Sequence, residues 1–340
     1  MRYTLLGQSG LRVSELCLGS MTFGTDWDFG GSTDEAKAQM KLFADTGGNF
    51  VDTANNYTNG TAEKVIGEVI SADRDYWVVG TKYTLSTRPD DPNAAGNSRK
   101  NLVRTLETSL RRLRTDHVDI LWVHAWDDLT PIEEVLRALD DQVRAGKVLY
   151  IGISDVPCWV GAYGQALAGL RGWSPLVGLE VPYSLAAREV EREFLPMARA
   201  MGMGVCAWGP LSGGLLSGKY VSGVASSEPR RLRGESPERL HLAQGLADAA
   251  ADLGTTSANL ALAWLRHQDV IPIVGARTAA QLADNLGALD VELTSADLHR
   301  LDLLSPIDLG FSRGFLDSMT GVVHGPGMRE RIDRPPMHLR

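Results

Sequence analysis

The stretch NFVDTANNYTNGTAEKVIGEVI, residues 49–70, contains the pattern on which the fold depends. It begins with a short apolar run, 49–52, that ends at Asp52 in a polar, amide-rich turn. From about residue 61 to residue 72 the chain has the character of a helix. We therefore predict one unit of buried strand, polar loop and helix.

The same unit recurs along the chain. Strand-like apolar runs lie at 15–19, 49–52, 76–82, 117–124, 148–154, 176–181, 204–208 and 270–275. Helix-like segments separate them, at 33–46, 61–72, 98–114, 131–145, 156–169, 189–201, 238–267 and 278–289. Several carry N-terminal signals, such as Ser32, Thr130-Pro131 and Thr278. The chain therefore contains eight strand–helix pairs without a linker between them.

Eight such pairs close either into a (β/α)8 barrel or into a doubly wound sheet that binds a nucleotide. The doubly wound fold predicts G-x-G-x-x-G just after an early strand, and no strand-like run is followed by one. The barrel is favoured. We predict an α/β fold, a (β/α)8 TIM barrel in one domain over 1–340. Its expected parts are an N-terminal β-hairpin, a core over about 14–290, long βα loops at 83–98 and 208–237, and a C-terminal helix and tail over 294–340.

Composition excludes several classes of function. The 340 residues carry a net charge of −8, which argues against a broad nucleic-acid surface. No apolar stretch is long enough for a signal peptide core or a membrane span. Cys17, Cys158 and Cys206 lie far apart, which indicates reduced thiols and not a disulfide framework or zinc site. We expect a cytoplasmic protein without a metal, with a small-molecule partner and no nucleic-acid or membrane partner; the oligomeric state is unknown.

Four ionisable side chains follow consecutive predicted strands. Asp52 ends the second strand and Tyr57 follows it, Lys82 ends the third, and His124 ends the fourth. Each alone has an ordinary structural explanation, such as a cap, a solvated charge or a core histidine. In a barrel of this type, however, the carboxyl ends of the strands carry the active site. The four together therefore indicate a catalytic site.

The chemistry that fits this set is delivery of a proton to a carbonyl. Tyrosine has an ordinary pKa near 10, which is high for an acid–base catalyst. We expect the Lys82 ammonium to lower the pKa of Tyr57 and Asp52 to hold Lys82 in place. His124 is positioned to donate a hydrogen bond to the carbonyl oxygen. Because none of these groups is a reductant, a hydride cofactor is required.

At these motifs the sequence resembles the aldo-keto reductase family over nearly the whole chain. The segments that carry the resemblance are DTANNYTNGTAEKVIGEVI, VVGTKY and DILWVHAWD, at 52–70, 78–83 and 119–127. Segment 92–102 and the long tail are similar to the bacterial NADP-dependent oxidoreductases of this family, whose fold potassium-channel β subunits share. The resemblance implies a tetrad with Tyr57 as the general acid, completed by Asp52, Lys82 and His124. It also implies NADPH lying extended across the barrel mouth.

The resemblance further assigns the residues that hold the cofactor. Ser154 and Asp155 match the pair at the nicotinamide amide, and Trp208 matches the aromatic that stacks on the ring. Glu180 falls where a Gln usually grips that amide, and an ionised carboxylate could not donate to it. Arg277, before a predicted helix, favours NADPH over NADH. The remaining cofactor-binding residues implied are Gly19, Ser20, Met21, Gly209, Pro210, Leu211, Gly213, Lys219, Gly275, Ala276, Gln281, Asp284 and Asn285.

The substrate is less well defined by the sequence. The candidate pocket residues are Met21, Trp27, Tyr83 and Trp126, together with the loops around 25–30 and 83–98. Their aromatic or apolar character suits a carbonyl compound with an apolar body. We predict NADPH-dependent reduction of an aldehyde or ketone to the alcohol. Two alternatives remain open on the same scaffold: a nucleotide-sugar keto or enoyl reductase, and a slow, redox-sensing NADP-binding module.

Overall fold

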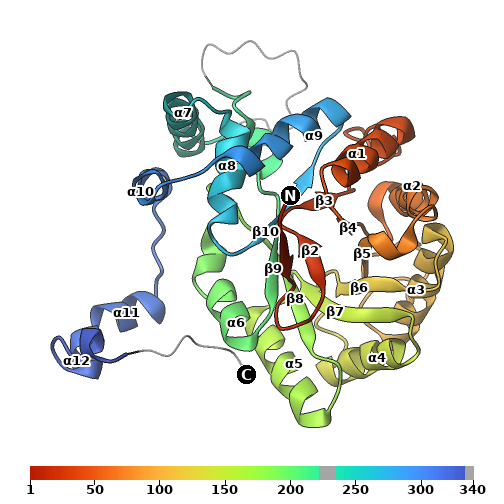
Figure 1. The fold of residues 1–340 in the computed structure, drawn as a ribbon. Coiled ribbons are helices and arrows are strands. Elements are labelled where there is room, and N and C mark those ends of the chain that lie inside the picture. The colour runs from red at the N-terminus through yellow and green to blue at the C-terminus, as the bar shows by residue number, and fades with distance from the viewer. Residues whose placement is uncertain (222–234, 334–340) are drawn as a thin grey trace.

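Eight parallel strands close into a barrel in the computed structural model, which describes residues 1–221 and 235–333. Each strand pairs with the next along the chain, and the last pairs with the first, so the predicted (β/α)8 barrel is confirmed (Figure 1). The barrel strands are β3 (Cys17–Gly19), β4 (Phe50–Asp52), β5 (Val78–Tyr83), β6 (Val118–Val123), β7 (Val148–Ser154), β8 (Leu176–Pro182), β9 (Gly204–Trp208) and β10 (Ile271–Gly275).

Helices surround the barrel. They are α1 (Thr33–Asp45), α2 (Thr61–Ile70), α3 (Arg99–Leu113), α4 (Ile132–Arg144), α5 (Cys158–Arg171), α6 (Phe194–Met201), α7 (Pro237–Asp252), α8 (Ser257–Arg266), α9 (Ala279–Leu286) and α10 (Ser295–Leu304). Ser32 and Thr278 cap α1 and α9 as predicted, each accepting a hydrogen bond from a first-turn N–H. Thr130 is no such cap, because its hydroxyl lies 2.9 Å from Asp127 Oδ2.

One helix prediction was wrong. Segment 238–267 was expected to be a single helix, but it forms α7 and α8 with a turn between them. Gly254 has φ +66° in this turn, a backbone conformation that glycine adopts without steric cost. Thr256 then caps α8 by accepting from the Asn259 N–H. Because α8 begins with its own cap after this turn, the two helices fold back against each other.

Because side chains alternate along each strand, one set points into the barrel interior and the other packs against the surrounding helices. Along β5 the side chains of Val78 and Lys82 lie inside the barrel, and those of Val79 and Tyr83 pack against the helices. The indole of Trp122, from β6, fills the barrel interior. It fits because three neighbouring strands carry glycine there: a Cβ added at Gly80, Gly152 or Gly178 would come within 2.7, 2.2 or 2.7 Å of the ring. This packed layer forms the floor of the barrel mouth.

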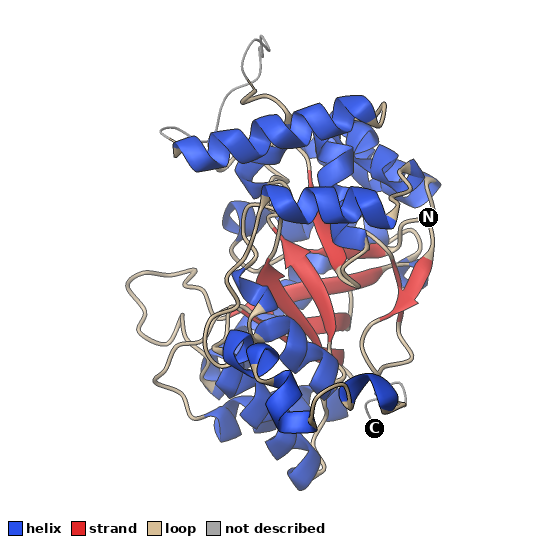
Figure 2. Cartoon of the chain, turned by 90° about the vertical axis from the view of Figure 1, so that its left-hand side faces the viewer, coloured by secondary structure: helices blue, strands red, loops and turns tan. Residues whose placement is uncertain are grey.

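The N-terminal hairpin closes the opposite end of the barrel. It consists of β1 (Tyr3–Leu5) and β2 (Arg12–Ser14), which pair antiparallel as predicted. Leu6 and Val13 are fully buried in the interior cluster that also contains Trp122. The Gln8 N–H donates to the Gly202 oxygen, just before β9, at 2.9 Å. Figure 2 shows the hairpin on one side of the barrel and the long loops on the other.

The long connections differ in how much of them is described. Loop 83–98 is held by Asp127, whose Oδ2 accepts from the Asn97 N–H at 2.6 Å. In the connection 208–237 the first part forms a short 3-10 helix, η4 (Ser212–Ser217), and 222–234 lie outside the described residues. The tail after α10 forms two short helices, α11 (Arg313–Ser318) and α12 (Thr320–His324), which lie away from the barrel (Figure 1).

Two further sequence expectations bear on the fold. Cys17, Cys158 and Cys206 are free thiols, and the first and last are buried inside the barrel. Over 1–221 and 235–333, no helix combines the length and the apolar character that crossing a membrane requires.

Candidate active site

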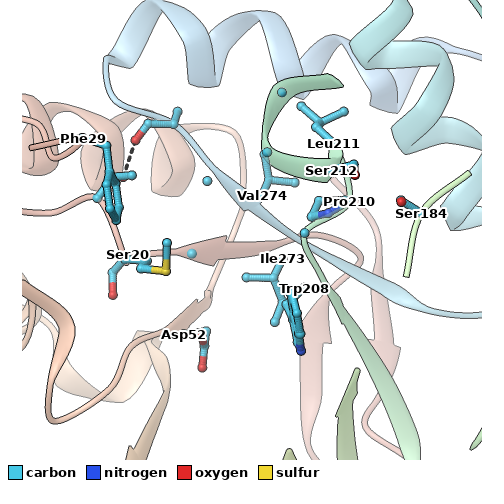
Figure 3. Close-up of a pocket in the computed structure, with 18 of the residues that line it drawn as sticks. Ser20, Phe29, Asp52, Ser184, Trp208, Pro210, Leu211, Ser212, Ile273 and Val274 are labelled. Atoms are coloured by element: carbon cyan, nitrogen blue, oxygen red, sulfur yellow. Dashed lines mark hydrogen bonds between the residues drawn. The ribbon is translucent and has the colours of Figure 1, made fainter. Parts of the chain in front are cut away.

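A cavity of about 1180 Å³ opens at the carboxyl ends of the barrel strands. Asp52, Tyr57, Lys82 and His124 all line it, so the structure brings the four predicted side chains together. Figure 3 shows Ser20 and Phe29 on one side of this cavity, Leu211 and Ser212 on the opposite side, and Ile273 and Val274 between them.

Lys82 is the centre of the ionic contacts in the cavity floor. Its Nζ donates to Asp52 Oδ2, to the Thr53 carbonyl at 3.1 Å and to the Tyr57 hydroxyl at 3.3 Å. The side chains of Lys82 and Asp52 are only 2% and 3% exposed. Removal of an ammonium from water is costly unless it is paired, so this pairing keeps Lys82 charged.

The turn that carries Tyr57 has an unusual backbone. Thr58, Asn59 and Gly60 have φ of 43°, 54° and 89°, in the left-handed region that a β-branched residue such as threonine rarely adopts. The buried Thr58 hydroxyl donates to the Phe23 carbonyl at 2.6 Å. The guanidinium of Arg112 donates to the Asn55 carbonyl at 2.7 Å. These contacts fix the turn and thereby hold the Tyr57 ring over Lys82, whose Nζ lies 5.0 Å from the ring centroid.

The pKa of Tyr57 differs from the sequence expectation. Burial raises it above the ordinary tyrosine value, and the Lys82 charge, which lowers it, is opposed by the nearby charge of Asp52. We expected Lys82 to lower the pKa, but desolvation is the larger effect. Tyr57 is therefore a protonated phenol at neutral pH, which is the form that a general acid must have.

His124 lies beside Tyr57, with 5.9 Å between the ring centroids and an angle of 79° between the ring planes. Burial, and then the nearby Lys82 charge, lowers the pKa of His124 to about 3. The imidazole is consequently neutral at physiological pH. It offers one ring N–H as a hydrogen-bond donor without placing a second cation in the cavity floor.

Glu180 also belongs to this ionic cluster, and the sequence alone did not indicate its contact with Lys82. The inward alternation of β8 directs its side chain towards Lys82, and Oε2 lies 3.4 Å from Lys82 Nζ. Burial raises the pKa of Glu180 well above its ordinary value, the nearby charge of Asp52 raises it further, and Lys82 opposes both. Two carboxyl groups therefore share one buried ammonium.

The remaining cofactor candidates also line this cavity. Trp208 ends β9 with 41% of its surface exposed, and its Nε1 donates to Asp155 Oδ1 at 3.2 Å, which fixes the ring. A Cβ added at Gly209 or Gly275 would meet open space, so the backbone there is accessible to a ligand. The others that line the cavity are Gly19, Ser20, Met21, Ser154, Pro210, Leu211, Gly213, Lys219, Ala276, Arg277, Gln281, Asp284 and Asn285.

Comparison with known proteins identifies the family. The model of the aldo/keto reductase family matches residues 15–305. This chain belongs to the aldo/keto reductase family. Norsolorinic acid reductase stcV of Emericella nidulans is 37% identical over 345 residues, with 97% of this chain and 87% of that protein covered.

Two further relatives show the range of the family around this chain. The oxidoreductase YrpG of Bacillus subtilis is 40% identical, with 90% of this chain and 96% of that protein covered. Aryl-alcohol dehydrogenase [NADP(+)] of Phanerodontia chrysosporium is 35% identical, with 89% of this chain and 85% of that protein covered. The aldo/keto reductase described here is accordingly an oxidoreductase with fungal and bacterial relatives.

Two predicted substrate residues of this aldo/keto reductase do not line the cavity, whereas Trp27 does. Tyr83 is fully buried on the helix side of the barrel, because it follows the inward-facing Lys82 and strand side chains alternate. Trp126 packs beside α4 and the Val156 segment. We therefore correct the prediction and place neither in the substrate pocket.

The loops around 25–30 and 83–98 contribute apolar side chains to the cavity of this aldo/keto reductase, namely Phe29 and Leu85. The Trp27 and Phe29 rings lie 5.6 Å apart. Sequence reasoning missed Arg239. Arg239, in the first turn of α7, reaches the cavity and donates to Ser212 Oγ at 2.9 Å. No local motif marks Arg239, since a long connection separates it from η4.

The charge at the start of α9 also differs from the simple expectation for a phosphate site. Glu35 Oε2 of α1 accepts from the Ala279 N–H, the first of α9, at 2.7 Å. A carboxylate therefore already uses one of the N–H groups that we expected to face phosphate. Besides Lys82, three cationic side chains line the same cavity nonetheless: Lys219, Arg239 and Arg277. Within 1–221 and 235–333, no group of three or more His, Cys, Asp or Glu side chains is placed to hold a metal ion.

Proposed function

We propose that this aldo/keto reductase uses NADPH to reduce an aromatic aldehyde or ketone to the alcohol, with Tyr57 as the proton donor. The contact between Tyr57 and the Lys82 ammonium, at 3.3 Å in the cavity floor, is the observation that carries the proposal. The phenol is protonated, and the lysine is positioned to stabilise the phenolate that remains after proton transfer.

The cavity suits a nicotinamide dinucleotide. Its lining includes both Tyr57 and Asn285 of α9. The backbones of Gly209 and Gly275 are accessible from it. The exposed ring of Trp208 offers a flat surface for a planar heterocycle. Lys219, Arg239 and Arg277 supply positive charge for phosphates, which supports NADPH in preference to NADH. When bound, this cofactor supplies the hydride.

The chain's own residues provide the rest of the chemistry. The Tyr57 hydroxyl transfers its proton to the carbonyl oxygen of the substrate. The neutral imidazole of His124 donates a hydrogen bond to the same oxygen, which stabilises the negative charge that develops there. Asp52 holds Lys82 beside the phenol. The buried floor excludes water, so these electrostatic interactions act in a low-dielectric environment.

Aromatic surface near Tyr57 supports the substrate class. Trp27 lies 6.3 Å from Tyr57 between ring centroids and is in contact with Phe29, so a planar apolar body would find partners beside the proton donor. Relatives named as aryl-alcohol dehydrogenases support the same class. The name aryl-alcohol dehydrogenase describes the reverse direction of this reaction, oxidation of the alcohol.

The experiment that tests the proposal follows NADPH oxidation with a panel of aromatic aldehydes, aromatic ketones, aliphatic aldehydes and one 4-keto nucleotide sugar. Tyr57→Phe is run alongside wild type, and Tyr76→Phe serves as the matched control because Tyr76 lies outside the cavity lining. We expect aromatic carbonyls to give the highest kcat/KM. Tyr57→Phe should lower it by roughly 10²–10⁴-fold, and Tyr76→Phe should leave it near the wild-type value.

Three results would contradict the proposal. Undiminished turnover in Tyr57→Phe would exclude the Tyr57 phenol as the proton donor. A preference for the nucleotide sugar would exclude aromatic carbonyl compounds as the substrate class and favour nucleotide sugars. Tight NADPH binding with very slow turnover on every carbonyl would favour a redox-sensing module on the same scaffold.

A further inference from the structure

The cavity floor contains one more acid than it has cations. Asp52, Lys82 and Glu180 come from β4, β5 and β8, and their side chains are 3%, 2% and 1% exposed. Lys82 Nζ contacts Asp52 Oδ2 and lies 3.4 Å from Glu180 Oε2. Two ionised carboxylates would leave an uncompensated negative charge in this dry site, which is strongly unfavourable. The cluster therefore holds a proton.

The contacts locate that proton. Asp52 is in closer contact with Lys82 than is Glu180, whose Oε2 lies 3.4 Å from the ammonium. Glu180 is the more weakly compensated of the two through this contact alone, since each acid also has one buried oxygen, Asp52 Oδ1 and Glu180 Oε1, without a partner among the described residues. A shared proton is held most stably by the acid whose ionised form has the poorer compensation, which is Glu180.

The groups around Glu180 on the other strands do not change this balance. Ser154 of β7 is its register partner on one side, and the thiol of Cys206 on β9 is its partner on the other. Cys17 of β3 is the second buried thiol of the interior, and burial raises the pKa of both thiols, so they stay neutral. The phenol of Tyr57 and the imidazole of His124 are neutral as well. Lys82 is thus the cation of the cluster.

We infer that Glu180 is a neutral carboxylic acid in the working protein and serves at the nicotinamide wall as an uncharged hydrogen-bonding group. Its nicotinamide contact rests on the function proposed above, whereas its protonation follows from the cluster alone. In this form the hydroxyl donates and the carbonyl oxygen accepts, as the two ends of a side-chain amide do.

Protonation of Glu180 has two consequences for the site. Lys82 faces one full negative charge instead of two, so more of its field acts on the Tyr57 phenol 3.3 Å away. The wall beside the nicotinamide also carries no charge of its own. The oxidised ring is positive and the reduced ring is neutral, so an ionised Glu180 would favour the oxidised cofactor, whereas a protonated Glu180 discriminates little between them.

The inference is tested first by infrared spectroscopy of the free protein at pH 7. A protonated carboxylic acid has a carbonyl stretch that ionised carboxylates lack. We expect one such band that is absent in Glu180→Gln and that shifts when glutamate carboxyl carbons are labelled with carbon-13. A band that shifts only with labelled aspartate would place the proton on Asp52, and absence of the band would mean that the cluster is fully ionised. Either result would overturn the inference.

The second measurement compares dissociation constants for NADPH and NADP+ from quenching of protein fluorescence at pH 7. We expect the ratio of the two constants to differ by less than about threefold between wild type and Glu180→Gln. A change of roughly tenfold or more towards NADPH in the variant would show that the wild-type side chain is ionised, given the strength of charge interactions at this depth.

Glu63→Gln is the matched control, because Glu63 is equally buried but has its own arginine at 3.0 Å. We expect it to leave both the infrared band and the ratio of dissociation constants unchanged. Loss of the band in this control would assign the proton elsewhere and refute the inference. Failure of wild type to bind either cofactor would refute the proposed function while the infrared band still decided the state of Glu180.

Discussion

Two buried ionic clusters lie on opposite faces of β5, at successive residues. Thr81 faces the helices, where its hydroxyl donates to Glu63 at 2.8 Å, and Glu63 also pairs with Arg112 at 3.0 Å. Lys82 faces the barrel mouth, where it contacts Asp52 and Glu180. The outer cluster has one acid and one base, whereas the inner cluster has two acids and one base.

The two clusters differ in how many of their buried polar atoms have hydrogen-bond partners. Both oxygens of Glu63 have partners, and Arg112 also donates to the Asn55 carbonyl. In the inner cluster Asp52 Oδ1, Glu180 Oε1 and the neighbouring His124 Nδ1 are buried without partners in the described part of the chain. Buried polar groups without partners are costly and therefore rare outside functional sites. A satisfied cluster stabilises the fold, and an unsatisfied one retains capacity for a ligand.

The largest expected effect lies in the inner cluster. Lys82→Met should lower kcat by roughly 10³-fold or more, because the phenolate of Tyr57 loses its stabilising charge. Steady-state turnover with an aromatic aldehyde measures this effect. Glu63→Gln, which alters the outer cluster but keeps Arg112 in place, should keep most of the wild-type kcat in the same assay. Similar losses in both variants would remove the functional distinction between the clusters.

The outer cluster should dominate stability. Arg112→Leu leaves Glu63 buried without its cation and should lower the free energy of unfolding by about 3 kcal/mol. Urea denaturation measures the change. Arg137→Leu is the control, because Arg137 pairs with Asp141 at the surface with 46% of its side chain exposed. We expect that control to stay within about 1 kcal/mol of wild type, and equal losses would contradict a special role for the buried pair.

The pH dependence of stability should reveal the raised pKa of Glu180. Because the pKa of Glu180 is raised in the folded protein, the fold binds a proton that the unfolded chain releases above the ordinary glutamate pKa of 4.5. Its contribution is fully present below that pKa and is lost as pH rises towards the folded value, by up to about 1.4 kcal/mol per pH unit. Denaturation between about pH 5 and 8 should show a shallower decline for Glu180→Gln than for wild type. A steeper decline in Glu180→Gln than in wild type would contradict a raised pKa of Glu180.

The smallest effect concerns Thr81. Thr81→Val removes its hydrogen bond to Glu63 with little change in shape and should cost about 1 kcal/mol of unfolding free energy. Turnover should be unchanged, because the side chain faces away from Lys82. Thermal denaturation and the turnover assay together test this. A large loss of turnover would mean that the two faces of β5 are coupled.

The fold was predictable because its signals are local and repeated. Period-two and helical patterns, caps such as Ser32 and the missing glycine fingerprint together select the barrel. The break at Gly254 was missed because apolar residues continue at helical spacing on both sides of it. A single glycine in a helical pattern does not by itself indicate a turn.

The site was predictable only where a residue's position along its own strand decides where it points. Asp52 and Lys82 were expected to meet because parallel strands end at one rim. Tyr83 was misplaced because aromatic character was given more weight than strand alternation, and Trp126, which follows β6, packs beside α4 instead. The contact between Glu180 and Lys82 joins strands β8 and β5 across the barrel, and Arg239 approaches from a distant helix. No local pattern encodes either.

The N-terminal hairpin has a consequence for the order of events during turnover. Since Leu6 and Val13 fill the amino end of the barrel, ligands enter and leave by the opposite mouth. If a long dinucleotide and a small carbonyl compound share that entrance, the one that lies deeper must arrive first and depart last. On the function proposed above, this requirement predicts a compulsory-order kinetic scheme.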